Sequence, residues 1–489
     1  MRPTMTNETA TMEDALQDLF RGRFGAPPDS VAPLKGDGSN RRLFRLRGGE
    51  RSVIGAFGPD PKENRAFLAF SRHFRAQGLP VPEIYADDAA RGLYLEEDLG
   101  DTTLFDFLVS RRTGAGFPEE AVAAYRKTIR ALPRFQVEAG RTLDYGLCYP
   151  RASFDKQSMM WDLNYFKYYF LRLAGVAFDE QGLEDDFQRF SDFLLGAERD
   201  YFLYRDFQSR NVMLREGEPW FIDYQGGRKG ALQYDVASLL YDAKADIPFA
   251  VRDHLLEEYL EELGKRVRVD RASFLAHYHG FVFIRLMQAL GAYGLRGFYE
   301  RKSHFLQSIP YAIANLEHLL GTAELPVELP ALVGVWKSLT GSSRLRQFGD
   351  AALKLKVRIE SFSYRTGAPA DERGHGGGFV FDCRSLPNPG REERFKRLDG
   401  RDGAVAQYLG KEPAVGLFLE HAAALVEGAV ENYRQRNFTD LYVAFGCTGG
   451  QHRSVYLAER LAERLRAKGV SVELRHREQE RREAADGAA

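Results

Sequence analysis

The sequence predicts an α+β unit with two lobes, followed by a separate and smaller α/β domain. Residues 14–103 combine strand-like segments with one amphipathic helix, residues 104–320 show mostly helical periodicity, and residues 350–480 alternate strands with helices. The chain has 489 residues, of which 44% are hydrophobic. At roughly 100–200 residues per domain, this length corresponds to about two to four domains with proper cores.

The expected elements follow the same order along the chain. In the first lobe we expect strands over residues 42–46, 52–57 and 92–96 and a helix over residues 63–77. In the second lobe we expect helices near residues 119–137, 159–174, 183–197, 250–264 and 271–293. A mixed lobe that precedes a helical lobe is the layout of a two-lobe, protein-kinase-like fold.

A linker is predicted at residues 321–349, because residues 321–330 are rich in Pro, Gly and Glu and follow a helical pattern that ends at Gly321. The last residues, 481–489, are charged and then rich in Ala, and we expect them to fray. Residues 341–489 hold 25 Lys/Arg and 21 Asp/Glu, against 43 and 48 in the rest of the chain. The net charge of −1 therefore averages an acidic first part and a mildly basic second part.

The composition favours a cytoplasmic location. Three cysteines, Cys148, Cys383 and Cys447, cannot form a disulfide framework and are typical of a reducing compartment. No apolar run reaches the ~18 residues of a membrane span, and residues 1–15 lack the apolar core of a signal peptide. The near-neutral charge argues against a uniformly basic protein, so neither DNA nor a membrane is an expected partner.

Two polar motifs in the second lobe are typical of phosphoryl transfer. Asp206 and Asn211 lie five residues apart in a predicted loop, and Asp223 ends an apolar strand twelve residues further on. Phosphoryl transfer needs a carboxylate that accepts the hydroxyl proton, and ligands for the metal ion that neutralises the phosphates. We therefore expect Asp206 to be the catalytic base and Asn211 and Asp223 to hold Mg²⁺.

Three segments of the first lobe are candidates for the nucleotide site. Residues 36–41 form a Gly-rich loop, whose small residues allow backbone N–H groups to approach phosphates closely. A helix that opens near Glu63 supplies an acidic partner, and residues 96–100 are expected at the hinge between the lobes, where backbone groups meet an adenine. The candidate nucleotide-binding residues are Gly38, Ser39, Asn40, Arg41, Glu63, Glu96 and Asp98.

Taken in order, the strings GDGSNR, LEEDLGD, YRDFQSRN and FIDYQGG resemble those of the aminoglycoside phosphotransferase (choline kinase-like) family. The resemblance covers about residues 14–320, and it is nearest to the bacterial anomeric sugar kinases that act on N-acetylmuramate or N-acetylglucosamine. It implies ATP and Mg²⁺ as cofactors and the roles already given to Asp206, Asn211 and Asp223. It also implies that Asp235 tethers the catalytic loop.

Two positions depart from the pattern of this family. The usual first residue of the catalytic loop is His, and here it is Tyr204. The usual Lys of the third strand, which pairs with the nucleotide phosphates, is absent from residues 53–57. Either Arg41 or Lys35 would have to supply this positive charge.

A second constellation lies near the C-terminus. An apolar strand over residues 441–445 precedes the Gly-rich turn GCTGGQHRS, and a helical pattern over residues 455–465 follows. Backbone N–H groups at the start of a helix converge on one point and favour an anion there. Cys447 and Arg453 also have the C-x₅-R spacing of cysteine phosphatases, although a buried structural thiol is the preferred interpretation of Cys447.

The strings SFSYRTGAP, FVFDCRSLPNP, GCTGGQHRSV and RHRE closely resemble the C-terminal domain of the RNase adapter RapZ, over about residues 350–480. In that family this domain is associated with sensing glucosamine 6-phosphate and with binding small RNA. Its N-terminal P-loop unit has no counterpart here, so the adapter role does not follow. The resemblance implies a phosphate site built from Cys447, Thr448, Gly449, Gly450, Gln451, His452, Arg453 and His375.

The sequence thus supports a main hypothesis and two alternatives. The main hypothesis is an ATP- and Mg²⁺-dependent phosphotransferase that acts on a sugar or amino sugar and carries a C-terminal domain that senses a phosphosugar. The first alternative is an adapter that binds RNA or protein through a degenerate kinase-like scaffold. The second is a C-x₅-R phosphatase fused to a kinase.

Overall fold

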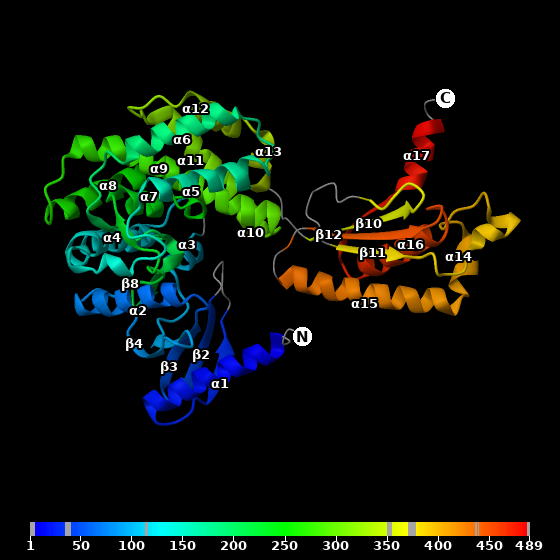
Figure 1. Ribbon diagram of the computed structural model, residues 1–489, viewed down its shortest axis with the longest axis horizontal. Helices are drawn as coiled ribbons and strands as arrows, with labels where there is room; N and C mark the ends of the chain where they lie inside the picture. Colours follow the sequence, from blue (N-terminus) through cyan, green and yellow to red (C-terminus); the bar gives the residue numbers. More distant parts are fainter. Residues whose placement is uncertain are drawn as a thin grey trace. The chain divides into compact units, whose positions relative to one another are not determined.

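The computed structural model describes residues 5–34, 41–112, 116–349, 355–369, 378–435, 438 and 440–486. Its contacts divide the chain into two compact units (Figure 1). Unit 1 comprises residues 1–168, 176–291 and 311–342, and unit 2 comprises residues 169–175, 292–310 and 343–489.

The first lobe of unit 1 is built on a five-stranded antiparallel sheet with the strand order β1-β2-β3-β5-β4. Its strands are β1 (Ser30–Pro33), β2 (Arg42–Gly48), β3 (Arg51–Phe57), β4 (Ile84–Asp88) and β5 (Leu93–Glu97). Two helices accompany them, α1 (Met5–Phe24) and α2 (Pro61–Ala76). Asp60 caps α2 by accepting hydrogen bonds from the N–H groups of Lys62 and Glu63, which explains why the helix begins there.

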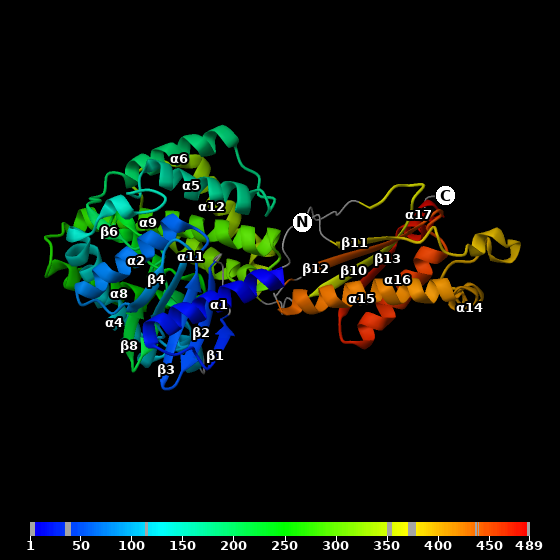
Figure 2. The same cartoon turned by 60° about the horizontal axis from the view of Figure 1, so that its bottom comes forward.

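The two faces of this sheet carry different helices, because side chains alternate along each strand. On one face, Leu16 and Phe20 of α1 pack with apolar residues of β2, β3 and β5. Figures 1 and 2 both show α1 running alongside these strands. On the other face, Tyr94 of β5 lies 5.1 Å from the ring of Phe67 in α2. Glu96 lies two residues beyond Tyr94 in β5 and therefore shares the face toward α2.

The second lobe of unit 1 is mainly helical. Its longer helices are α3 (Leu104–Arg111), α4 (Glu119–Pro133), α5 (Lys156–Phe166), α6 (Glu180–Leu194), α7 (Gln233–Leu240), α8 (Phe249–Gly264), α9 (Arg271–Tyr293), α11 (Ile309–Thr322) and α12 (Pro330–Thr340). Two short antiparallel pairs carry the catalytic motifs, β6 (Tyr201–Leu203) with β9 (Arg228–Gly230), and β7 (Val212–Arg215) with β8 (Glu218–Phe221). The expected two-lobe, kinase-like layout is confirmed.

Unit 2 contains a parallel four-stranded sheet in the order β11-β12-β10-β13. The strands are β10 (Lys356–Ser363), β11 (Gly378–Asp382), β12 (Asp440–Cys447) and β13 (Ser471–His476), and the main helices are α14 (Gly403–Gly410), α15 (Pro413–Gln435), α16 (Arg453–Ala467) and α17 (Arg477–Asp486). Helices α15 and α16 pack against the sheet, with Val426, Leu457 and Leu461 in its buried core. The expected small α/β domain is confirmed.

Three features differ from the expectations. Helix α1 was not anticipated, because its residues lack a strong apolar stripe outside positions such as Leu16 and Phe20. Residues 321–349, expected as a linker, include α12, which packs on α6 and buries Trp336 against Phe283 with the ring centroids 4.2 Å apart. The boundary between the units lies instead after Ser342. The tail expected to fray is helical as far as Asp486.

One helix in the described part of the chain is long and apolar enough to cross a membrane by its length and composition, the segment Pro413–Arg434 of α15. This differs from the expectation that no apolar run reaches the length of a membrane span. Length and composition do not distinguish a membrane span from a core helix. Val415, Ala422, Ala423, Val426 and Val430 of this helix are buried in the core of unit 2.

Candidate functional site

The catalytic loop leaves β6 and is held by the buried carboxylate of Asp235, at the start of α7. Asp235 Oδ2 accepts a hydrogen bond from the N–H of Tyr204 (2.9 Å), and Oδ1 accepts one from the N–H of Arg205 (3.0 Å). Gln136 Nε2 donates a third (3.1 Å). The tethering role expected of Asp235 therefore has a direct structural basis, because the bond pattern fixes the backbone immediately before Asp206.

Arg205 adds a second anchor next to the catalytic residue. Its backbone is left-handed, with φ of 82°, which is uncommon for a residue other than Gly. Its guanidinium forms two hydrogen bonds with the carboxylate of Asp162 (2.7 and 2.8 Å) and one with Tyr234 Oη (2.6 Å). No local pattern predicts this pair, because Asp162 lies 43 residues upstream on α5.

The three residues expected to perform the chemistry lie together. Asn211 Nδ2 donates to the backbone oxygen of Asp206 (2.9 Å) and to Asp223 Oδ2 (3.2 Å). Burial, and then the neighbouring Asp223 carboxylate, raise the pKa of Asp206 above its ordinary value, whereas nearby arginines oppose this shift. Asp206 and Asp223 thus form a close acidic pair that a bound cation would relieve.

Asn211 and Asp223 offer a small oxygen donor set that fits Mg²⁺. Among the residues that the structure describes, no group of three or more His, Cys, Asp or Glu side chains is arranged to hold a metal. Mg²⁺ is commonly held by one or two carboxylates together with substrate phosphates, rather than by a cage of protein ligands. The donor set is therefore compatible with a metal that arrives with a nucleotide.

Tyr204 stands where the related family usually has His. Its side chain is fully buried, and its hydroxyl donates to the backbone oxygen of Ile222 (2.6 Å). Its ring packs edge-on against Phe207 and Tyr224, with centroids 5.2 and 5.9 Å away. Tyr204 therefore connects the catalytic loop to the segment that carries Asp223.

The candidate nucleotide residues separate into three groups. Gly38, Ser39 and Asn40, together with Lys35, lie outside the described residues. Arg41, Glu63 and Glu96 lie together with Asp223: Arg41 Nη2 is 2.8 Å from Glu63 Oε1, and burial raises the pKa of Glu96 to about 7. Asp98 is bonded elsewhere, to Ser52 Oγ (2.5 Å) and to Arg45 Nε (2.8 Å), so its contacts are with the sheet.

The Gly-rich turn of unit 2 joins β12 to α16. Cys447 Sγ lies 3.1 Å from Ser454 Oγ. Burial raises the pKa of this thiol, but hydrogen bonds from the Ser454 side chain and from the N–H groups of Ser454 and Gln451 outweigh burial and lower it. These donors favour negative charge inside the turn. Thr448 and Gly449 are exposed, and His375 lies outside the described residues.

Three side chains of the turn bind neighbouring backbone oxygens. Gln451 Nε2 donates to Leu398 (2.6 Å), His452 Nε2 is 2.9 Å from the oxygen of Phe395, and Arg453 Nη1 donates to Leu386 (2.8 Å). Arg453 also donates to the oxygen of Arg384 (2.9 Å). In a cysteine phosphatase this arginine would hold the substrate phosphate. The phosphatase alternative therefore finds no support in the geometry.

Comparison with known proteins agrees with this division of the chain. Residues 30–275, half of the chain, match the phosphotransferase enzyme family. The chain belongs to this family. Residues 355–480 match the RapZ C-terminal domain. The phosphotransferase match includes the catalytic loop and the residues around Asp223, and the second match includes the turn that begins at Cys447.

Relatives and solved structures resemble separate portions of this phosphotransferase. A "Nucleotide-binding protein" of Dinoroseobacter shibae is 44% identical over 139 residues, which are 28% of this chain and 45% of the relative. The chain spans about half the length of the curated relatives it matches. An ethanolamine kinase of Plasmodium vivax has a TM-score of 0.44 at 12% identity, covering 63% of this chain and 84% of the other. The choline kinase LicA of Streptococcus pneumoniae has a TM-score of 0.38 at 13% identity, covering 67% and 97%.

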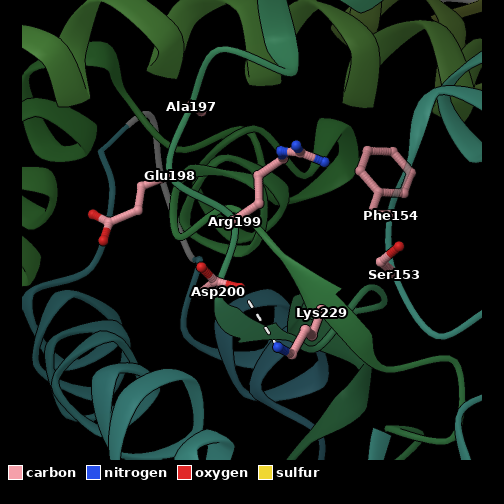
Figure 3. Close-up of a pocket in the computed structure, with 7 residues that line it drawn as sticks. All are labelled: Ser153, Phe154, Ala197, Glu198, Arg199, Asp200 and Lys229. Carbon is pink, nitrogen blue, oxygen red and sulfur yellow. Dashed lines mark hydrogen bonds and ion pairs between the residues drawn. The ribbon is translucent and has the colours of Figure 1, made fainter. Parts of the chain in front are cut away.

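The phosphotransferase unit also contains a cavity of about 340 Å³ that the sequence did not indicate. It is lined by Ser153, Phe154, Ala197, Glu198, Arg199, Asp200 and Lys229 (Figure 3). Lys229 Nζ lies 3.5 Å from Asp200 Oδ1. Asp200 immediately precedes β6, whereas Asp206 follows that strand, so this cavity and the catalytic residues lie at opposite ends of β6.

Proposed function

We propose that the phosphotransferase unit transfers the γ-phosphoryl group of ATP to a hydroxyl of a sugar or amino sugar similar to N-acetylmuramate or N-acetylglucosamine. The observation that carries this proposal is the cluster that Asp206 and Asn211, on a loop tethered by Asp235, form with Asp223. Asp206 accepts the proton of the acceptor hydroxyl, whose oxygen forms the new bond to phosphorus as the bond to the ADP oxygen breaks. The choice of a sugar rests on the family resemblance of the motifs.

Asn211 and Asp223 are the residues that would hold Mg²⁺. The metal supplies positive charge that neutralises the transferring phosphates. Asp223 lowers the tendency of Asp206 to ionise, so a cation beside Asp223 favours the ionised, proton-accepting form of Asp206. The residues of the loop contribute by holding Asp206 in place, because catalysis of phosphoryl transfer depends on positioning together with electrostatic stabilisation.

Purified protein with Mg·ATP and a panel of sugars, amino sugars and aminoglycosides tests this proposal. We expect ADP release that depends on one class of sugar, a loss of at least about 100-fold in kcat for Asp206→Asn, and normal turnover for Asp253→Asn. Asp253 is an exposed residue of α8 and serves as the matched control. Intact ATP binding without turnover on any acceptor would refute the proposal.

We further propose that unit 2 binds a phosphosugar such as glucosamine 6-phosphate at the turn after β12. The lowered pKa of Cys447 supports this, because the same N–H groups that stabilise a thiolate also stabilise a phosphate. The exposed Thr448 and Gly449 leave the turn accessible. RNA is the competing ligand, since the second part of the chain has a modest excess of basic residues.

Thermal shift with glucosamine 6-phosphate, glucosamine and inorganic phosphate distinguishes these ligands. We expect stabilisation by the phosphosugar that Thr448→Glu abolishes, because the new carboxylate repels the phosphate. Ser471→Glu adds the same charge at the start of β13, at the opposite end of the parallel strands from the turn, and should leave the shift unchanged. No shift in the wild type, combined with salt-dependent RNA binding, would favour the adapter alternative instead.

A further inference from the structure

The third strand of the phosphotransferase sheet offers no cation to a nucleotide. Residues that face each other in an antiparallel pair share one side of the sheet. Ile54 pairs with Glu96 and Ala56 pairs with Tyr94, and Tyr94 packs on Phe67 of α2. The side of β3 toward α2 therefore carries Ile54 and Ala56, both apolar. A basic residue on this side would have to come from another strand.

Arg41 lies at that place, immediately before β2. Its Nη2 is 2.8 Å from Glu63 Oε1, near the start of α2, and its Nη1 is 4.0 Å from Asp223 Oδ1. The guanidinium carbon lies 5.1 Å from the centre of the Phe67 ring, which supports its flat face. The Arg41 side chain is only 10% exposed. Arg41 thus extends from the first lobe to the residue expected to bind the metal.

The electrostatics agree with a buried, permanently charged group. Burial opposes the charge of Arg41, yet the nearby Tyr94, Asp223, Glu63 and Glu96 raise its pKa above the ordinary value. Arg41 is therefore a fixed cation among three carboxylates. A phosphate bound beside Asp223 would lie within reach of this guanidinium, whose planar donors suit phosphate oxygens.

We propose that Arg41 binds the nucleotide phosphates in place of the cation that β3 lacks, with Glu63 as the acidic residue that orients it. In kinases, a basic residue of the third strand forms an ion pair with a Glu of the following helix. Here the helix and its Glu63 are retained, and the cation comes from the start of β2. This inference rests on the proposed kinase function, but it concerns nucleotide binding and is testable without an acceptor.

Direct binding of Mg·ATP, Mg·ADP and adenosine to the full chain tests Arg41. We expect Arg41→Ala to weaken Mg·ATP binding about tenfold or more, because charge-assisted hydrogen bonds to phosphate are lost. Adenosine affinity should stay within about twofold, and Arg41→Lys should retain an intermediate affinity because it keeps the charge. Arg47→Ala removes an exposed charge from β2, the strand that follows Arg41, and should behave as the wild type.

A second variant tests for a recovery of binding, which misfolding could not explain. Arg41→Ala combined with Ala56→Lys places a basic residue on the side of β3 that faces Tyr94, and should recover part of the Mg·ATP affinity. Circular dichroism and thermal unfolding show whether each variant is folded. Equal Mg·ATP affinity in Arg41→Ala, Arg47→Ala and wild type would overturn the inference, whatever the turnover. If Arg41→Ala loses Mg·ATP binding and the wild type turns over no sugar, the inference about Arg41 is upheld. Only the sugar-kinase proposal is then refuted.

Discussion

Replacing Asp235 by Asn should loosen the catalytic loop without changing the shape of the side chain. Both carboxylate oxygens of Asp235 accept backbone hydrogen bonds, from the N–H groups of Tyr204 and Arg205. An Asn has one accepting oxygen, so its NH₂ group must face one of these N–H groups. Asp235 is fully buried, so water cannot replace the lost partner.

The magnitude follows from this count of donors. Leaving one buried N–H donor without a partner costs about 1–3 kcal/mol. We expect urea unfolding to show a loss of that size for Asp235→Asn. Because Asp206 directly follows Arg205, kcat should fall more than the affinity for nucleotide or acceptor changes. Asp253→Asn, on an exposed position, should alter neither quantity.

The assay combines urea denaturation followed by tryptophan fluorescence with steady-state kinetics on the best acceptor. Wild-type stability together with wild-type kcat in Asp235→Asn would refute the tethering argument. A loss of stability without any change in kcat would show that the tether supports folding but does not position Asp206.

Three further predictions concern other parts of the chain. Burial raises the pKa of Glu96 to about 7, so the folded state favours the protonated carboxyl. The contribution of Glu96 to stability therefore decreases as the pH rises from about 4 to 7. Glu96→Gln should raise the melting temperature relative to wild type at pH 8 but not at pH 4, and an equal difference at both pH values would contradict this prediction. Trp336→Ala should lower the free energy of unfolding, measured by urea denaturation, by about 3–5 kcal/mol, because it opens a cavity beside Phe283. An unchanged free energy of unfolding would support the linker interpretation instead. Gly450→Ala should lower the melting temperature, because φ is +62° and a Cβ would lie 2.9 Å from Ser363 N. Gly449→Ala has nothing within 4 Å of its Cβ and should keep the melting temperature of the wild type. Equal melting temperatures of the two variants would contradict the argument.

Local patterns predicted most regular elements. The strands expected over residues 42–46, 52–57, 92–96 and 441–445 agree with β2, β3, β5 and β12, because alternation and β-branched or aromatic residues are local signals. Helix α12 lies within the segment expected to be a linker, and its burial was not predicted. Burial depends on which surface a helix meets, and the stacking of Trp336 on Phe283, more than fifty residues away, leaves no mark on the local pattern.

In the candidate sites, too, local spacing was informative, whereas contacts between distant residues were not predictable. The spacing of Asp206, Asn211 and Asp223 indicated a cluster, and the structure brings them together. Asp98 looked equivalent to Glu96 in the sequence, since both lie in the segment expected at the hinge between the lobes. The structure separates them: Asp98 is bonded to Arg45 and Ser52, whereas Glu96 lies near Arg41. Glu96 pairs with Ile54 within the sheet, whereas Asp98 lies beyond the end of β5, so their contacts depend on the strands and loops around them.

By itself, the sequence determined the order of the two parts, their fold classes and the types of residue available for chemistry, because composition, periodicity and motif spacing are properties of the chain. Only the tertiary structure decided which charged groups meet. It paired Arg41 with Glu63, placed both beside Asp223, and turned Gln451, His452 and Arg453 toward backbone oxygens of a neighbouring segment. Such pairs join residues that are far apart in the chain, and their distances are set by how strands, helices and turns pack.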